Sequence, residues 1–204
     1  PLRGGTLVTP RRMPRRACRL PDGIGVWPAV ALFFCFCWAE IAWPGNAVPP
    51  DLAIAVLAYC AINWIAMAAY GIDTWLSRGE AFTRLFALVG QFAPYDARRH
   101  ELRCWGAGLT QSPRGLSNSK MAFVVLLVAS VSFDGFRETP FWDGATSSLT
   151  ALLYHAGLLA LIGNVAAASL IATLGLLLAP MVLALLYFGA CAFCAAILRA
   201  NSAF

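Results

Sequence analysis

The sequence predicts an all-α protein, a bundle of helices that crosses a membrane several times. Of its 204 residues, 60% are hydrophobic and only 12% are charged, about half the roughly 25% of a soluble domain. The mean hydropathy of +0.69 is correspondingly high. The apolar residues also fall into runs of membrane-spanning length, separated by clusters of basic residues. Lipid is therefore the expected solvent for most of this chain.

The positions of the basic residues predict the orientation. Of the 15 Lys and Arg residues, six precede residue 20 and seven lie between Arg78 and Lys120. Positive charge collects on the cytoplasmic side of bacterial inner-membrane proteins. We therefore expect residues 1–23 and the loop 73–120 to be cytoplasmic, and the segments 44–50 and 134–148 to face outward.

The first two spans are expected at residues 24–43 and 52–72. Trp27 and Trp43 stand near the ends of the first, where aromatic side chains meet the membrane interface. The Pro- and Gly-rich segment 44–50 between the two spans predicts a short turn.

The loop 73–120 contains an amphipathic pattern over residues 80–93, which Pro94 ends. Apolar side chains recur there at offsets of three and four, and Arg84 and Gln91 stand elsewhere on the helical wheel. The pattern predicts an interfacial helix on the cytoplasmic surface or packed under the bundle. It also offers a docking surface for a protein partner. The apolar positions are Phe82, Leu85, Phe86, Val89 and Phe92.

The third span is expected at residues 121–142, although its uninterrupted apolar run ends at Phe133. Asp134, Arg137 and Glu138 would then lie at the outer interface. Their spacing of three and four places them on one helix face, where they can form ion pairs.

Residues 149–198 are almost uncharged and too long for one crossing of about 30 Å. A break near Gly163 and Asn164 predicts a helical hairpin, with spans at 149–164 and 168–198. Pro180 is expected to kink the second of these helices. The complete expectation is about five spans and one interfacial helix, in a single membrane domain over 24–198.

The same features bound the partners and cofactors. The basic residues flank apolar spans and lack the polar groove of a nucleic-acid-binding surface, so anionic membrane lipid is the expected partner and nucleic acid is not. Five of the seven cysteines lie in apolar segments and are expected to pack as small hydrophobic residues. No motif predicts a metal site or a cofactor.

Two sequence elements resemble a known family. The first runs from Asp73 to Phe82 as DTWLSRGEAF and is followed by Phe92-Ala-Pro94 and Trp105-Gly106; the second runs from Ser130 to Trp142 as SVSFDGFRETPFW. Both are similar to bacterial polytopic membrane proteins commonly labelled fenitrothion hydrolase or fenitrothion hydrolase-like, over roughly residues 20–145. The resemblance implies a multi-span inner-membrane protein, and the label implies hydrolysis of an organophosphate P–O ester. Because family members are longer and residue 1 is Pro, we expect a piece of a longer protein.

Candidate catalytic residues are the charged groups inside these two elements. The alternative interpretation of each group is a helix cap or an interfacial anchor. His100 lies in a basic loop and His155 is alone in an apolar helix, so neither predicts a His-rich metal site. The candidates are Asp73, Arg78 and Glu80 at the inner interface, and Asp134, Arg137 and Glu138 at the outer interface.

The function stays open between three classes. The first is a membrane-embedded phosphoester hydrolase. The second is a transporter or permease-like component, in which Asn63 and Asn164, expected to be buried amides, would line a pathway. The third is a structural or partner-binding membrane component without enzymatic activity.

Overall fold

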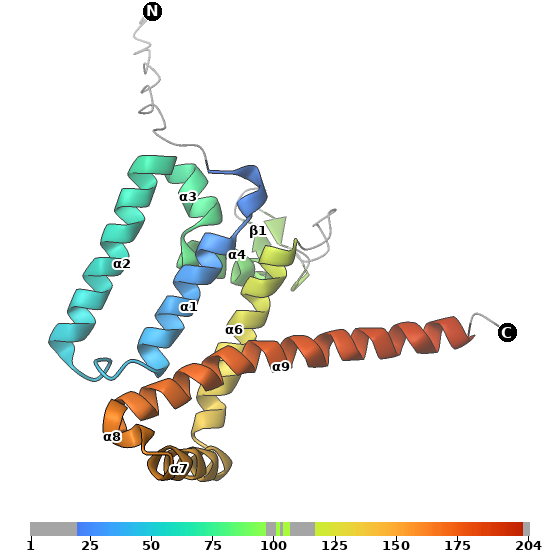
Figure 1. The fold of residues 1–204 in the computed structure, drawn as a ribbon. Coiled ribbons are helices and arrows are strands. Elements are labelled where there is room, and N and C mark those ends of the chain that lie inside the picture. The colour runs from blue at the N-terminus through green and yellow to red at the C-terminus, as the bar shows by residue number, and fades with distance from the viewer. Residues whose placement is uncertain (1–19, 97–100, 103, 107–116, 202–204) are drawn as a thin grey trace, which may run out of the picture.

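The computed structural model describes residues 20–96, 101–102, 104–106 and 117–201 (Figure 1). Most of the basic segment 1–23, His100 and part of the expected loop 73–120 lie outside these residues. Within the described part the chain is all-α, as predicted, apart from two strands of two residues each, β1 (Tyr95–Asp96) and β2 (Glu101–Leu102). These strands pair antiparallel and were not expected from the sequence.

Three helices that alternate in direction form the body of the structure: α1 (Trp27–Ile41), α2 (Pro49–Tyr70) and α6 (Asn118–Arg137) (Figure 1). Proline starts both α1 and α2, since its missing N–H is not needed in a first turn. Their positions confirm helices at the first, second and third predicted spans. With only 15 residues, α1 is shorter than predicted.

The core lies where α1 packs against α6. Buried side chains recur every four residues along α1, at Ala29, Phe33, Cys37 and Ile41, so they form one stripe. The ring of Phe33 lies 5.3 Å from that of Phe123 on α6. At the start of α1, a short 3₁₀ turn η1 (Asp22–Ile24) precedes the helix.

The third predicted span is wrong at its C-terminal end. Helix α6 ends at Arg137, and α7 (Pro140–His155) begins three residues later. The Oγ1 atom of Thr139 accepts a hydrogen bond from the N–H of Trp142 and caps α7, while Pro140 has no N–H to continue α6. The segment 134–148, expected as an outward loop, is therefore mostly helical.

The fourth predicted span, 149–164, is not a single helix. Gly157 has φ = 72° and separates α7 from the short helix α8 (Leu158–Ile162). The break predicted near Gly163 is confirmed, since Gly163 has φ = 78° before α9 (Asn164–Asn201) begins. Asn164 is exposed, so its expected burial is wrong. Among the described residues, three helices rather than five are long and apolar enough to span a membrane: α2, α6 and α9.

Helix α9 has two halves with different surroundings. Its 38 residues extend over about 57 Å, and the helix continues through Pro180. In the first half, Thr173 accepts a 2.9 Å hydrogen bond from the indole of Trp38, and Ser169 donates one of 2.6 Å to the carbonyl of Ala42. These bonds fasten α9 to α1. The second half projects away from the other helices (Figure 1).

Candidate functional site

The first of the two sequence elements, at residues 73–82, folds back against α2. Gly71 ends α2 with φ = 89°, a conformation that side chains disfavour and glycine permits. Helix α3 (Ile72–Arg78) follows at once and contacts α2. Trp75 of α3 is only 7% exposed, and its ring stacks on that of Tyr70 at 6.0 Å.

A buried hydrogen bond joins α3 to α2. The indole Nε1 of Trp75 donates to Oδ1 of Asn63 over 2.8 Å, and the Nδ2 of Asn63 donates to the carbonyl of Tyr59 over 2.9 Å. Both ends of the amide are therefore satisfied within the protein. Asn63 is buried, as expected, and it bonds a neighbouring helix, as buried amides in membrane spans commonly do.

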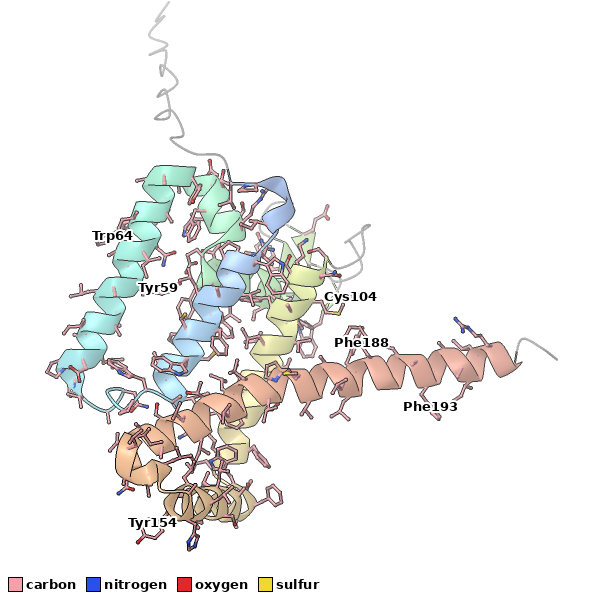
Figure 2. The ribbon with its side chains drawn as sticks, viewed as in Figure 1. Tyr59, Trp64, Cys104, Tyr154, Phe188 and Phe193 are labelled. Atoms are coloured by element: carbon pink, nitrogen blue, oxygen red, sulfur yellow. The ribbon has the colours of Figure 1, made fainter. Side chains whose placement is uncertain are left out.

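Glu80 is the centre of a second set of hydrogen bonds. Its carboxylate caps α4 (Ala81–Val89), accepting from the N–H groups of Phe82 and Thr83. The hydroxyl of Tyr59 also donates to this carboxylate. Figure 2 shows Tyr59 on the side of α2 that faces α1, with Trp64 on the other side. One carboxylate thus joins α2 to the start of α4.

The contact with Tyr59 fixes the position of Glu80 along the axis of α2. Tyr59 is the eleventh of the 22 residues of α2, so it lies about 16 Å along the axis from the end at Tyr70. Glu80 is therefore level with the middle of α2. Helix α3 thus carries the candidate carboxylate back along α2, away from the end of that helix at Tyr70.

The hydrogen bonds set the charge state of Glu80. Burial by itself raises the pKa of this carboxyl group, but the bonds from Thr83, Tyr59 and Phe82 outweigh burial. The pKa of Glu80 consequently lies below its ordinary value. At neutral pH the group is a carboxylate, which the positive end of the α4 dipole also favours.

The predicted interfacial helix 80–93 is shorter and partly buried. It consists of α4 and a 3₁₀ turn η2 (Gly90–Phe92). Its inner face packs against α1 and α2: the ring of Phe82 lies 5.1 Å from that of Phe36 on α1 and 5.7 Å from that of Tyr59 on α2. Its other apolar edge, with Phe86 69% exposed and Val89 55% exposed, has no cover in the described structure. The helix thus packs beside α1 and α2, and its place relative to a membrane surface stays a prediction.

The remaining cations and acids of the first group are dispersed. Asp73 is exposed in the first turn of α3, and Arg78 is half-buried in its last turn. Burial lowers the pKa of Arg84, which stands half-buried on the flank of α4.

The second group lies at the other end of the bundle, in the last turn of α6. Arg137 forms a 3.9 Å ion pair with Asp134, as the i, i+3 spacing predicted, and Glu138 ends the helix. Nearby, Phe133 and Trp142 make an edge-to-face contact at 5.2 Å. The structure does not bring Asp134 or Glu138 to Glu80.

The structure gives the surroundings of the described histidine and cysteine side chains. They include no group of three or more His, Cys, Asp or Glu side chains that could hold a metal ion. His155 is exposed at the end of α7 beside Tyr154, and His100 lies outside the described part. The described cysteines are free thiols, with Cys37 buried as a packing residue.

Comparison with known proteins finds no relative: no protein-family model, curated protein or solved structure matches the chain. The site therefore rests on its own geometry. Sequence reasoning found Glu80, Trp75 and Asn63 but missed Tyr59, the partner of Glu80. The only signal for Tyr59 in the sequence was a hydroxyl near the middle of an apolar span.

Proposed function

We propose that this chain is a helical component of a larger membrane assembly, in which its polar side chains fasten helices together. The main observation is that the second half of α9 is apolar and projects away from the other described helices (Figure 1). Leu185, Phe193 and Leu198 in this half are each at least two-thirds exposed. A segment such as 181–201 is long enough to cross the hydrocarbon core, about 30 Å, by itself.

Support for a fastening role comes from the polar groups inside the helices. Bonds between different helices run from Trp38 to Thr173, from Ser169 to Ala42 and from Trp75 to Asn63. The backbone N–H of Val26, just before α1, also donates to Oγ of Ser119 on α6 over 3.2 Å. In the described part of the chain, no buried side-chain nitrogen or oxygen lacks a hydrogen-bond partner. Polar groups used in this way hold helices in register in lipid.

The proposal includes location and orientation. Apolar helices of this length make the chain a membrane protein. We place it in the bacterial inner membrane, with the basic N-terminal segment and the 73–120 region toward the cytoplasm. In the structure, the start of α1, the end of α2 and the start of α6 share one end of the bundle, which supports this arrangement (Figure 1).

Photo-crosslinking in native membranes tests the assembly role. A benzophenone amino acid replaces Phe193 on the projecting half of α9, and Ile171, buried in the first half, serves as the matched control. We expect protein adducts of higher mass from position 193 and only intramolecular adducts from position 171. Adducts to lipid alone at position 193, together with a single chain per detergent micelle, would contradict the proposal.

Transport is the second candidate function, because Glu80 is an ionisable group level with the middle of α2. Such residues commonly mark ion or substrate pathways, and helices interrupted at membrane depth build transporter sites. Vesicles containing the chain would then show a proton or solute flux that Glu80→Gln abolishes. The assembly proposal expects no such flux and little effect of this isosteric change.

The hydrolase activity implied by the resemblance stays a prediction. It is tested with the chain in vesicles, a nitrophenyl phosphoester and added divalent metal ions. Nitrophenol release that depends on Glu80 or Asp134 would replace the assembly proposal with the enzymatic one. Release no faster than from empty vesicles is the result that the assembly proposal expects.

A further inference from the structure

The structure contains an apolar groove between α1, α6 and α9. We propose that this groove holds one acyl chain of an anionic phospholipid, with the headgroup at the end formed by Trp27 and Asn118. The inference does not depend on the assembly role, because the groove uses residues of α9 only as far as Phe188, whereas Phe193 and Leu198 lie beyond it and are exposed.

The groove has the size and chemistry of a site for an apolar chain. Its volume is about 670 Å³, within the roughly 300–1,000 Å³ typical of ligand sites. Phe34 of α1, Val125 of α6 and Met181 of α9 are among the residues that line it. Of the lining side chains, only the amide of Asn118 and the indole of Trp27 carry a hydrogen-bond donor.

These two donors stand together at one end. Trp27 is the first residue of α1 and Asn118 is the first residue of α6, and both helices begin at the same end of the bundle (Figure 1). Tryptophan at such a position is typical of the membrane interface, where its ring lies at the depth of lipid headgroups. The groove therefore has a polar mouth and an apolar interior, as an acyl chain with its headgroup requires.

The length of the groove favours an acyl chain over another helix. Along α6 the lining extends from Asn118 to Leu126, a rise of about 12 Å. One leaflet of the hydrocarbon core is about 15 Å thick, whereas a crossing helix needs about 30 Å. Helix α9 contacts α6 and supplies the far wall of the groove. Phe188, labelled in Figure 2, is the last residue of α9 in this wall.

The charge at the mouth favours an anionic headgroup. Lys120, two residues after Asn118, is exposed in the first turn of α6. Each cation near a membrane surface contributes about 1 kcal/mol to binding of anionic lipid. No acidic side chain lines the groove.

The test uses the whole chain in nanodiscs that contain photoactivatable phosphatidylglycerol or phosphatidylcholine, each with a diazirine on its acyl chain. We expect phosphatidylglycerol to label residues of the groove, at about tenfold higher yield than phosphatidylcholine. Ala122→Trp fills the groove and should lower this yield about tenfold. Ala61→Trp, at an exposed position of α2, should leave the yield unchanged.

Three results would overturn the proposal. One is equal labelling of the groove and of α2; another is unchanged labelling in Ala122→Trp with an unchanged thermal transition. The third is a benzophenone at Met121 that captures a second copy of the chain instead of lipid. Should Ala122→Trp fail to fold, Val125→Phe, which keeps an apolar side chain in the same wall, takes its place and must give the same loss.

Discussion

The indole Nε1 of Trp75 lies 2.8 Å from Oδ1 of Asn63, so one hydrogen bond joins α3 to the middle part of α2. Asn63 is 5% exposed and Trp75 7%. In an apolar surrounding each partner needs the other, because neither water nor lipid replaces the lost bond. Trp75 thus has a structural role, which is to hold α3 against α2.

Asn63→Leu should destabilise the protein by about 1–2 kcal/mol, because it leaves the indole N–H of Trp75 buried without an acceptor. Thermal unfolding in detergent measures the loss. In the background of Trp75→Phe, which has no N–H to satisfy, the same substitution should cost clearly less. Two costs that simply add in the double variant would show that the two side chains are not coupled.

Glu80→Ala should cost about 1 kcal/mol, in the range of other lost helix caps, since Phe82 and Thr83 lose their acceptor. Glu80→Gln keeps an oxygen at the same place and should cost less. The comparison is made by thermal unfolding of both variants. A larger loss for Gln than for Ala would contradict the capping role.

The pH dependence of this contribution follows from the lowered pKa of Glu80. A carboxyl group with a lowered pKa stabilises the fold fully above its ordinary pKa of about 4.3 and loses this effect as the pH falls through the folded value. The difference in stability between the wild type and Glu80→Gln should therefore be constant from about pH 8 to pH 5 and shrink only below about pH 4. A difference that already disappears between about pH 7 and pH 6 would indicate a raised pKa.

The sequence predicted the helices well where the signal is local. Length of apolar run and Pro–Gly punctuation place α1, α2 and α6, and Gly163 marks the start of α9. The C-terminal limit of α6 was wrong, because the apolar run 121–133 is shorter than the roughly 20 residues that a crossing needs and the predicted span was therefore extended to residue 142. Thr139 and Pro140 instead start a new helix, and a cap followed by proline was the available signal.

The surroundings of α4 could not be predicted from periodicity. An amphipathic pattern shows that one face is apolar, but not whether this face meets lipid or protein. The partners of that face, Tyr59 and Phe36, are 23 and 46 residues away from Phe82 in the chain. The position of Glu80 beside the middle of α2 likewise depends on Gly71, where the chain turns back along α2. Composition does not reveal this turn.

Thiol labelling should report the topology. Cys104 is exposed in the 73–120 region, and Cys191 and Cys194 are exposed on the projecting half of α9. In inverted vesicles a membrane-impermeant maleimide should label Cys104, whereas the cysteines of α9 should react only after detergent solubilisation, since lipid suppresses the thiolate. A Cys104→Ser variant supplies the blank. Labelling of Cys104 in intact cells would reverse the orientation.

Two glycines of α9, Gly175 and Gly189, allow a matched comparison between the part of the helix that packs on α6 and α7 and the part that projects from them. A Cβ atom on Gly175 would lie 2.3 Å from Cζ of Phe133 and 2.7 Å from the ring of Trp142, whereas a Cβ on Gly189 would meet nothing within 4 Å. Gly175→Ala should therefore force α9 away from α6 and α7 and cost about 1–3 kcal/mol, as overpacking does.

Gly189→Ala should leave stability equal or raise it by up to about 1 kcal/mol, the helix propensity gained. Thermal unfolding of both variants in one detergent makes the comparison. Equal effects of the two substitutions would mean that α9 does not rest on Phe133 and Trp142. A loss at Gly189 alone, restricted to native membranes, would instead place a partner helix against the projecting half of α9, because a new methyl group is felt only where another surface is already in contact.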